Sequence, residues 1–178
     1  MIINNKIILK KITSEDTANI VRWRNSEAVR KYFIYQQDFT IESHTYWLEN
    51  VVNAGKAAQF IICEKNGERP VGSVFIKNLN SDEKDGEFGI FIGETDCLGK
   101  GYGTESAFKI LDYGFFTLGL SCIYLKVLKK NPRAIRCYQR IGFVEIPEKA
   151  KLEVINGQEE KVLHMSVLKK DFEASHGK

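Results

Sequence analysis

The chain has 178 residues, of which 43% are hydrophobic and 28% are charged, and these proportions are typical of one globular domain with a hydrophobic core. The formal net charge is +3 and no run of five or more like charges occurs, which excludes a nucleic-acid-binding or membrane-binding tail. No apolar run approaches the roughly 20 residues of a membrane span.

The first residues, MIINNKIILKKI, lack the apolar core and the cleavage site of a signal peptide. The four cysteines form no Cys-x-x-Cys pair, and no histidine stands near them at metal-ligand spacing. We therefore expect a cytoplasmic protein with reduced thiols and no bound metal.

The first predicted elements are one strand and two helices. Residues 6–12 read as a strand, and residues 13–25 read as a helix with acidic residues in its first turn. A second helix over 40–55 is predicted to begin at Thr40, which can cap it, and to end at Gly55.

Three strands are predicted to follow. Residues 57–65 and 70–79 are apolar runs on either side of the segment NGER, which is a hairpin signal. Residues 85–93 read as a third strand.

The second half alternates between helix and strand. The pattern predicts a helix over 102–119, a strand over 121–129 and a short helix over 131–142, in which Asn131 caps, Pro132 is the first helical residue and Gly142 ends the helix. Two further strands, 143–149 and 161–170, are predicted on either side of the turn NGQE.

The order of predicted elements is therefore β-α-α-β-β-β-α-β-α-β-β. Hairpins mixed with strand-helix-strand crossovers predict an α/β (α+β) fold with a mixed, mostly antiparallel sheet and helices on both faces. We expect a single domain over residues 1–178, with the last few residues forming a flexible tail.

Three alternating glycines, Gly99, Gly101 and Gly103, stand between a strand and a helix. A helix N-terminus preceded by glycines lets backbone N–H groups close on an anion such as a phosphate. The segment is not a Walker A loop, because Gly101 stands where a hydroxyl is needed. It is not a dinucleotide fingerprint either, because Ser106 replaces the third glycine. A glycine-rich turn without a ligand is the alternative.

Two motifs resemble the GNAT superfamily of acyl-CoA-dependent N-acetyltransferases. LGKGYG is similar to the family's Gln/Arg-x-x-Gly-x-Gly/Ala pyrophosphate loop, and NPRAIRCYQRIGF is similar to its Asn…Ala…Tyr…Gly-Phe segment. The resemblance covers nearly the whole chain and its element order. Leu98 departs from the pattern, because the family has Gln or Arg there; coenzyme A affinity could be lower for that reason.

The resemblance implies acetyl-CoA as the acetyl donor. Backbone amides from Gly99 to Thr104 would hold the pyrophosphate, and the strand 85–93 would splay from 122–128 and pair with the pantetheine arm. The residues expected to bind the cofactor are Phe91, Ile92, Gly93, Leu98, Gly99, Lys100, Gly101, Tyr102, Gly103, Thr104, Asn131 and Arg133.

Two residues are the candidate catalytic groups. An alkylammonium has a pKa of roughly 10, so a base must remove its proton before attack. The resemblance implies Glu87 as that base and Tyr138 as the acid that protonates the leaving thiolate. The alternatives are an ordinary strand-edge carboxylate and an aromatic residue packed on a helix face.

The acceptor is expected to contact the first two helices and their loops. The candidate substrate-binding residues are Trp23, Arg24, Asn25, Tyr35 and His44, although Trp23 also reads as a core residue and His44 as a surface or capping residue. The segments WRN and IESHTYWL resemble both the ribosomal-protein N-terminal acetyltransferase-like branch and UDP-amino-sugar N-acetyltransferases.

We expect an N-acetyltransferase that moves an acetyl group from acetyl-CoA to a primary amine by direct attack, the acceptor being an amino sugar nucleotide or a protein N-terminus. A polyamine acetyltransferase is the alternative, disfavoured by the few acidic residues in the acceptor segment. Two further alternatives are a non-catalytic acyl-CoA-binding or interaction module and a different nucleotide-dependent transferase. The prevalence of symmetric oligomers favours a homodimer.

Overall fold

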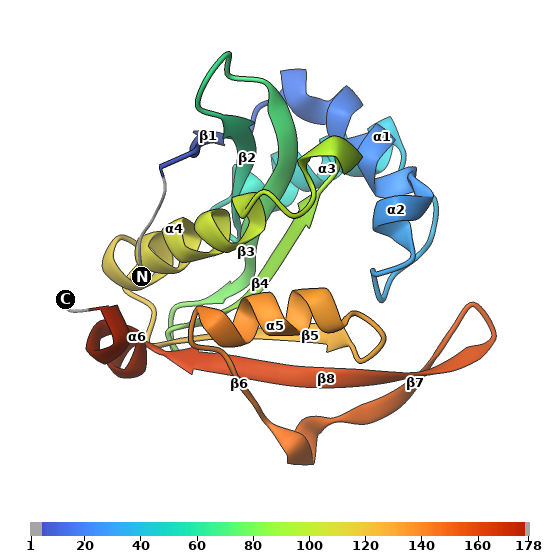
Figure 1. The fold of residues 1–178 in the computed structure, drawn as a ribbon. Helices are drawn as coiled ribbons and strands as arrows, with labels where there is room; N and C mark the ends of the chain where they lie inside the picture. Colours follow the sequence, from blue (N-terminus) through green and yellow to red (C-terminus); the bar gives the residue numbers. More distant parts are fainter. Residues whose placement is uncertain (1–4, 177–178) are drawn as a thin grey trace.

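The computed structural model describes residues 5–176 (Figure 1). The strands are β1 (Ile7–Lys11), β2 (Ala58–Glu64), β3 (Pro70–Asn80), β4 (Asp85–Ile92), β5 (Cys122–Leu128), β6 (Val144–Glu145), β7 (Lys151–Ile155) and β8 (Gln158–Leu168). The helices are α1 (Thr17–Asn25), α2 (Glu27–Arg30), α3 (Ile41–Trp47), α4 (Tyr102–Phe116), α5 (Pro132–Arg140) and α6 (Lys169–His176). Short 3₁₀ turns cover Ser14–Asp16, Thr95–Cys97 and Pro147–Lys149, and a π-helical turn covers Leu48–Val52.

All eight strands belong to one sheet in the order β1-β2-β3-β4-β5-β8-β6, and β7 pairs with the remaining part of β8. Strands β4 and β5 run parallel, and the other described pairs are antiparallel. The predicted mixed, mostly antiparallel sheet is therefore confirmed.

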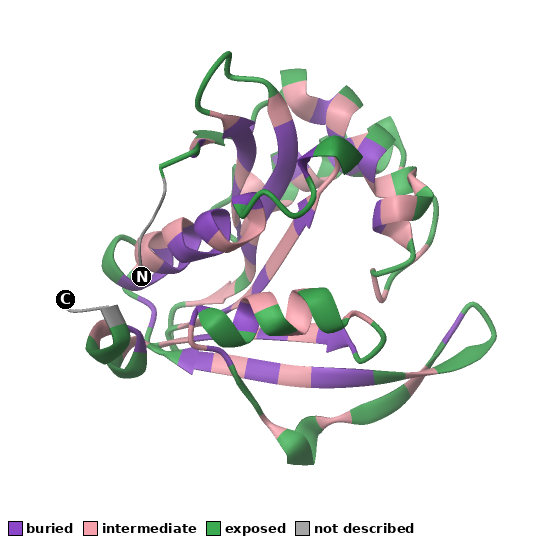
Figure 2. Ribbon diagram, viewed as in Figure 1, coloured by how far each residue is buried: buried purple, intermediate pink, exposed green. Residues whose placement is uncertain are grey.

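Helices cover both faces of the sheet. Successive strand residues point to opposite faces, so one strand contributes side chains to the core on each side. On β2, Ile62 joins the larger core under α4, α5 and α6, whereas Ile61 and Cys63 join a second core under α1 and α2. On β4, Phe88 belongs to the larger core and Phe91 to the second core. Figure 2 shows the buried residues along the central strands and on α4, whereas the tip of the β7–β8 hairpin is largely exposed.

The sheet opens between β4 and β5. The two strands pair only from Asp85 to Glu87, opposite Cys122 to Tyr124, although β4 continues to Ile92 and β5 to Leu128. Beyond Glu87 the ladder stops and the strands diverge. This is the splay that the family resemblance implied.

Local signals at the helix ends have the predicted effect. The Thr40 hydroxyl accepts a hydrogen bond from the Ser43 N–H at 3.1 Å, and Asn131 Oδ1 accepts one from the Ala134 N–H at 3.2 Å. Gly142 adopts a φ of +105°, which ends α5 at low steric cost.

The prediction for 143–149 as a strand is wrong beyond its first residues. Strand β6 contains only two residues, because Pro147 has no N–H to donate and begins a 3₁₀ turn. Strand β7 was not predicted. It forms a hairpin with the early part of β8, in which Ile155 pairs with Gln158.

The end of the described chain is a helix rather than the predicted end of a strand and a flexible tail. Phe172 of α6 is fully buried, and its ring centroid lies 5.2 Å from that of Phe108 and 5.3 Å from that of Phe115. These contacts hold α6 against α4. Residues 177–178 of the expected tail lie outside the described residues. Within residues 5–176, no helix combines the length and the apolar character needed to cross a membrane.

Candidate active site in the splayed cleft

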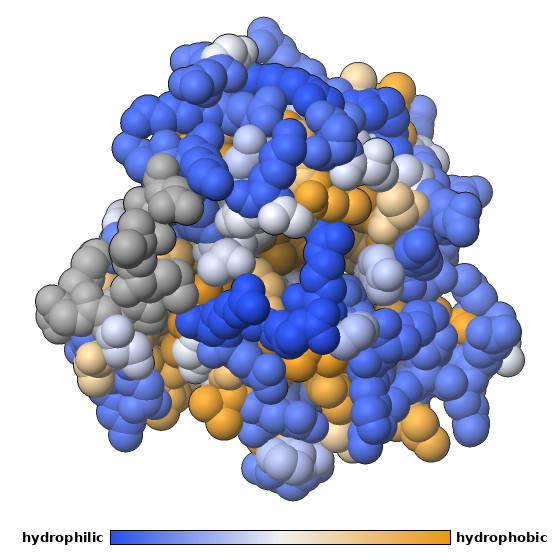
Figure 3. All heavy atoms as spheres, in the orientation of Figure 1, coloured by the Kyte–Doolittle hydropathy of each residue, from blue (hydrophilic) through white to orange (hydrophobic). Residues whose placement is uncertain are grey.

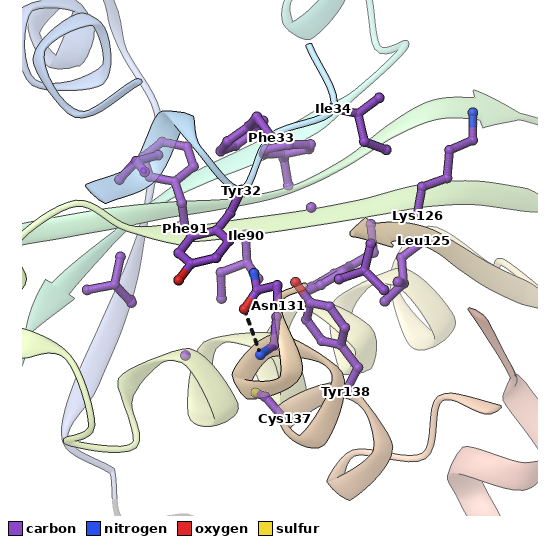
Figure 4. A pocket seen from close by; sticks show the side chains of 18 of the residues that line it. Tyr32, Phe33, Ile34, Ile90, Phe91, Leu125, Lys126, Asn131, Cys137 and Tyr138 are labelled. Carbon is purple, nitrogen blue, oxygen red and sulfur yellow. Dashed lines mark hydrogen bonds between the residues drawn. The ribbon is translucent and has the colours of Figure 1, made fainter. Parts of the chain in front are cut away.

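A cavity of about 270 Å³ lies where β4 and β5 diverge. Its walls are the segment from α2 to Tyr35, the part of β4 from Glu87 to Ile92, residues 125–127 of β5 and one side of α5 (Figure 4). The cavity therefore passes through the sheet and is bounded by residues from both of its faces.

A second cavity adjoins the first and is bounded by the glycine loop. Gly99 and Gly101 have φ values of +82° and +88°, a region that L side chains rarely adopt, so glycine is required there. The first backbone bond of α4 runs from the Glu105 N–H to the Gly101 carbonyl at 3.1 Å. The amides of the preceding residues, 102–104, therefore have no partner inside the helix and suit an anion.

The side chains of Tyr102 and Lys100, two of the predicted cofactor-binding residues, lie close to Glu64. The Tyr102 hydroxyl donates a 2.8 Å hydrogen bond to Glu64 Oε1, and this bond raises the pKa of Tyr102 to about 12. Lys100 Nζ lies 4.0 Å from the same oxygen. Leu98 lines the first cavity and gives it an apolar side chain where the family motif has a polar one.

The register of β4 corrects the expectation for the pantetheine contacts. The Gly93 N–H donates to the Val71 carbonyl at 2.8 Å, so it is used within the sheet. Because the ladder alternates, Phe91 also directs its backbone groups to β3, where it pairs with Ser73. The backbone groups of Ile92, and of Ile90, which was not predicted, face the open side toward β5.

Glu87 lies where the two strands part. It is the last residue of β4 that pairs with β5, and its side chain is only 15% exposed. Asn78 Nδ2 donates to Glu87 Oε2 at 3.0 Å, and Lys77 Nζ lies 3.4 Å from Oε1. By alternation with Phe88, the carboxylate is on the α1–α3 side of the sheet.

Tyr138 lies on the other side of the same cavity. Its ring packs edge-to-face on Phe88 at 5.6 Å, and its hydroxyl points into the cavity (Figure 4). Burial raises the pKa of Tyr138, so the hydroxyl keeps its proton at neutral pH. Asn131 uses Oδ1 as the cap of α5, and its Nδ2 group points to the opposite wall (Figure 4).

Three of the predicted acceptor residues have structural roles instead. Trp23 is buried in the second core, as the alternative interpretation had it, and its Nε1 donates to Glu94 Oε1 at 2.8 Å. Asn25 holds the backbone of Phe39 through two hydrogen bonds of 2.7 and 2.9 Å. His44 is also buried, and none of the three lines either cavity.

The other two acceptor candidates lie at or next to the cavity. Tyr35 lines it and is 71% exposed, which places it at the rim. The Arg24 guanidinium lies 3.4 Å from the ring centroid of Phe33, which lines the cavity, so Arg24 is behind the wall. Burial lowers the pKa of Arg24 to about 10.

Several lining residues were not predicted. They include Tyr32, Phe33, Ile34, Phe75, Lys77, Ile90, Lys126 and Cys137 around the first cavity, and Arg136 and Arg140 around the second. The aromatic cluster KYFIY and the spacing of the arginines were the available signals. Among residues 5–176, no group of three or more His, Cys, Asp or Glu side chains is placed to hold a metal ion.

Comparison with known proteins places this geometry among acetyltransferases. The model of the Acetyltransferase (GNAT) domain family matches residues 6–144. The spermidine N(1)-acetyltransferase of Escherichia coli K12 is 28% identical over 173 residues, which cover 90% of this chain and 92% of that protein. An uncharacterised protein of Methanocaldococcus jannaschii is 32% identical over 143 residues, and the match spans 79% of this chain but only 28% of that protein.

The fold also matches solved structures. The structure of spermidine N-acetyltransferase from Vibrio cholerae in complex with CoA and spermine superposes with a TM-score of 0.86 at 24% identity, covering 95% of this chain and 99% of that one. The comparison establishes the same fold.

Proposed function

The chain belongs to the GNAT acetyltransferase family and is an acetyl-CoA-dependent N-acetyltransferase, and we propose that it acetylates a primary amine of a polyamine such as spermidine. Acetyl transfer is supported by Glu87, a carboxylate held at the point where β4 and β5 part, in the same cavity as the Tyr138 hydroxyl. The polyamine acceptor is supported by the spermidine acetyltransferases among the relatives.

The residues of the cleft fit the donor. Acetyl-CoA supplies the activated acetyl group when it is bound. The unpaired amides at the start of α4 suit its diphosphate, and the open backbone groups of Ile90 and Ile92 suit the amides of its pantetheine arm. Asn131 offers its Nδ2 group on the opposite wall.

The two proposed catalytic groups lie on opposite sides of the sheet and line the same cavity. Glu87 accepts a proton from the acceptor ammonium, directly or through water, and so produces the neutral amine that attacks the acetyl carbon. The C–S bond of the adduct then breaks, and Tyr138, whose pKa burial raises, donates its hydroxyl proton to the departing sulfur. The nitrogen gives up its second proton to the Tyr138 oxygen, directly or through water, so the amide and the CoA thiol leave neutral and the tyrosine is restored.

The walls of the cavity suit a polyamine in part. Tyr32, Phe33 and Ile34 offer apolar surface to a methylene chain, and Glu87 balances one ammonium. The spermidine acetyltransferases among the relatives favour this acceptor over the amino sugar nucleotide and the protein N-terminus that the sequence suggested.

A second acceptor class is favoured by one observation. Lys77 and Lys126 line the same cavity, and two cations there disfavour a polycation. An amine attached to an anionic group would meet both lysines. The amino sugar nucleotide is therefore kept as the second candidate, with less support because Lys77 is already close to Glu87.

The test is a competition among acceptors. The protein is incubated with acetyl-CoA and equal concentrations of spermidine, a UDP-amino sugar and a short peptide with a free N-terminus, and mass spectrometry identifies the acetylated product. Acetylspermidine is the expected major product. Acetylation of the sugar or the peptide alone would refute the polyamine proposal, and tight CoA binding without any product would indicate a non-catalytic acyl-CoA-binding module.

A pair of variants tests the base. Glu87→Gln should lower kcat by about 10²- to 10⁴-fold, the usual contribution of general acid–base catalysis, and leave acetyl-CoA binding unchanged. Glu83→Gln makes the same chemical change at an exposed site four residues earlier and should retain wild-type turnover. Wild-type kcat in the Glu87 variant at every pH would remove Glu87 from the mechanism.

A further inference from the structure

Three arginines lie along one side of α5. Arg133, Arg136 and Arg140 are three and four residues apart, which places them on the same face of a helix. Together with the glycine loop they line the second cavity, whose volume is about 320 Å³. Figure 3 shows strongly hydrophilic side chains gathered over α5 at the edge of a hollow in this face.

The three guanidinium groups are exposed and have no carboxylate partner among the described residues. Within residues 5–176, no carboxylate lies within ion-pair distance of any of the three guanidinium groups. Like charges three or four residues apart on a helix repel one another. A bound anion would remove this repulsion, and guanidinium groups form their strongest hydrogen bonds with phosphate.

The order of the arginines matches the order of groups in CoA. Arg133 lines both cavities, whereas Arg136 and Arg140 line only the second cavity. Arg140 is seven residues further, about 10 Å along the helix at 1.5 Å per residue. In CoA the diphosphate follows the pantetheine arm, and the ribose with its 3′-phosphate comes last.

We infer that Arg136 and Arg140 form a second phosphate site that binds the 3′-phosphate of CoA and distinguishes CoA from 3′-dephospho-CoA. The inference rests on the proposed use of acetyl-CoA. The amides of the loop and Arg133 then serve the diphosphate. The two outer arginines bind the phosphate monoester, which carries about −1.5 to −2 charges at pH 7.

The experiment compares the affinities of two ligands, with and without the 3′-phosphate, for the wild type and for variants that lack the arginines. Isothermal titration calorimetry measures the Kd of CoA and of 3′-dephospho-CoA for the wild type, Arg136→Ala, Arg140→Ala and the double variant. Lys170→Ala, which removes an exposed cation from α6, is the control for net charge. Thermal unfolding shows that each variant is folded.

The wild type should bind CoA at least about tenfold more tightly than 3′-dephospho-CoA, because charge-assisted hydrogen bonds are lost with the phosphate. The double variant should bind both ligands with the affinity that the wild type shows for 3′-dephospho-CoA, and Lys170→Ala should retain the wild-type ratio.

Two results would overturn the inference while leaving the proposed function intact. One is a wild type that binds the two ligands equally. The other is a double variant that loses the same factor for both ligands, which would assign the arginines to the diphosphate. A wild type that binds neither ligand would refute the proposed function itself.

Discussion

Substitution of Gly93 by alanine tests whether this glycine is a packing residue. A Cβ atom at position 93 would lie 2.1 Å from Cγ and 2.3 Å from Cδ1 of Trp23. Carbon atoms in contact are normally about 3.5–4.0 Å apart, so the ring or the strand would have to move by more than about 1 Å. Trp23 has little freedom to move, because its Nε1 donates a hydrogen bond to Glu94 and its ring packs against Phe91, with 6.3 Å between the ring centroids.

The expected loss of stability in Gly93→Ala is estimated from substitutions that overpack the cores of other proteins. Such substitutions lower the free energy of unfolding by about 1–3 kcal/mol. At about 2–4 °C per kcal/mol for a chain of this size, the Tm of Gly93→Ala should fall by about 2–12 °C. Urea denaturation measures the free energy, and differential scanning calorimetry measures the Tm.

Two comparisons make the result specific. Gly103→Ala introduces the same methyl group within α4, where no atom lies within 4 Å, so its stability should be unchanged or higher. Trp23→Phe removes the larger ring, so its combination with Gly93→Ala should cost less than the sum of the two single changes. The reasoning is refuted if Gly93→Ala unfolds with the wild-type free energy, or if both glycine variants lose the same amount.

Two further predictions concern titratable groups. Tyr138→Phe keeps the ring packed on Phe88 and removes the hydroxyl, so kcat for thiol release should fall while the Tm changes little; wild-type turnover would exclude Tyr138 as the acid. Burial lowers the pKa of His44 below its unfolded value of about 6.5, so unfolding takes up a proton in acid, and stability is full above about pH 6.5 and decreases below it. His44→Gln should therefore reduce the loss of unfolding free energy between pH 7 and pH 5, measured by urea titration at both pH values. Equal losses in variant and wild type would contradict this. Part of the pH dependence of the unfolding free energy should persist in the variant, because burial also lowers the pKa of His164.

Features encoded by a few adjacent residues were predicted well from the sequence. The positions of Gly99 and Gly101 before α4, the Asn131 cap and the Gly142 stop each depend on local backbone conformation, and the structure contains them as expected. Tyr138 was expected from the family resemblance of the segment that follows the Asn131 cap. Local chemistry therefore located one wall of the candidate site.

Features that depend on distant partners were not predictable in the same way. Which backbone groups of β4 face the cleft depends on its register with β3, and a shift by one residue exchanges Phe91 for Ile92. The sequence shows that Trp23 is large and apolar, but not that it packs on Gly93. The burial of Phe172 depends on Phe108, which is 64 positions earlier in the chain.

The short pairing between β4 and β5 also has a consequence for the order of events in catalysis. The cavity beyond Glu87 is bounded by residues from both faces of the sheet, with the glycine loop on one face and the carboxylate on the other. If the donor binds at the glycine loop and the acceptor at Glu87, as proposed, the two approach from opposite faces of the sheet and can be bound at the same time. On that proposal the acetyl group passes directly from donor to acceptor in a single ternary complex, and no side chain has to carry it in between.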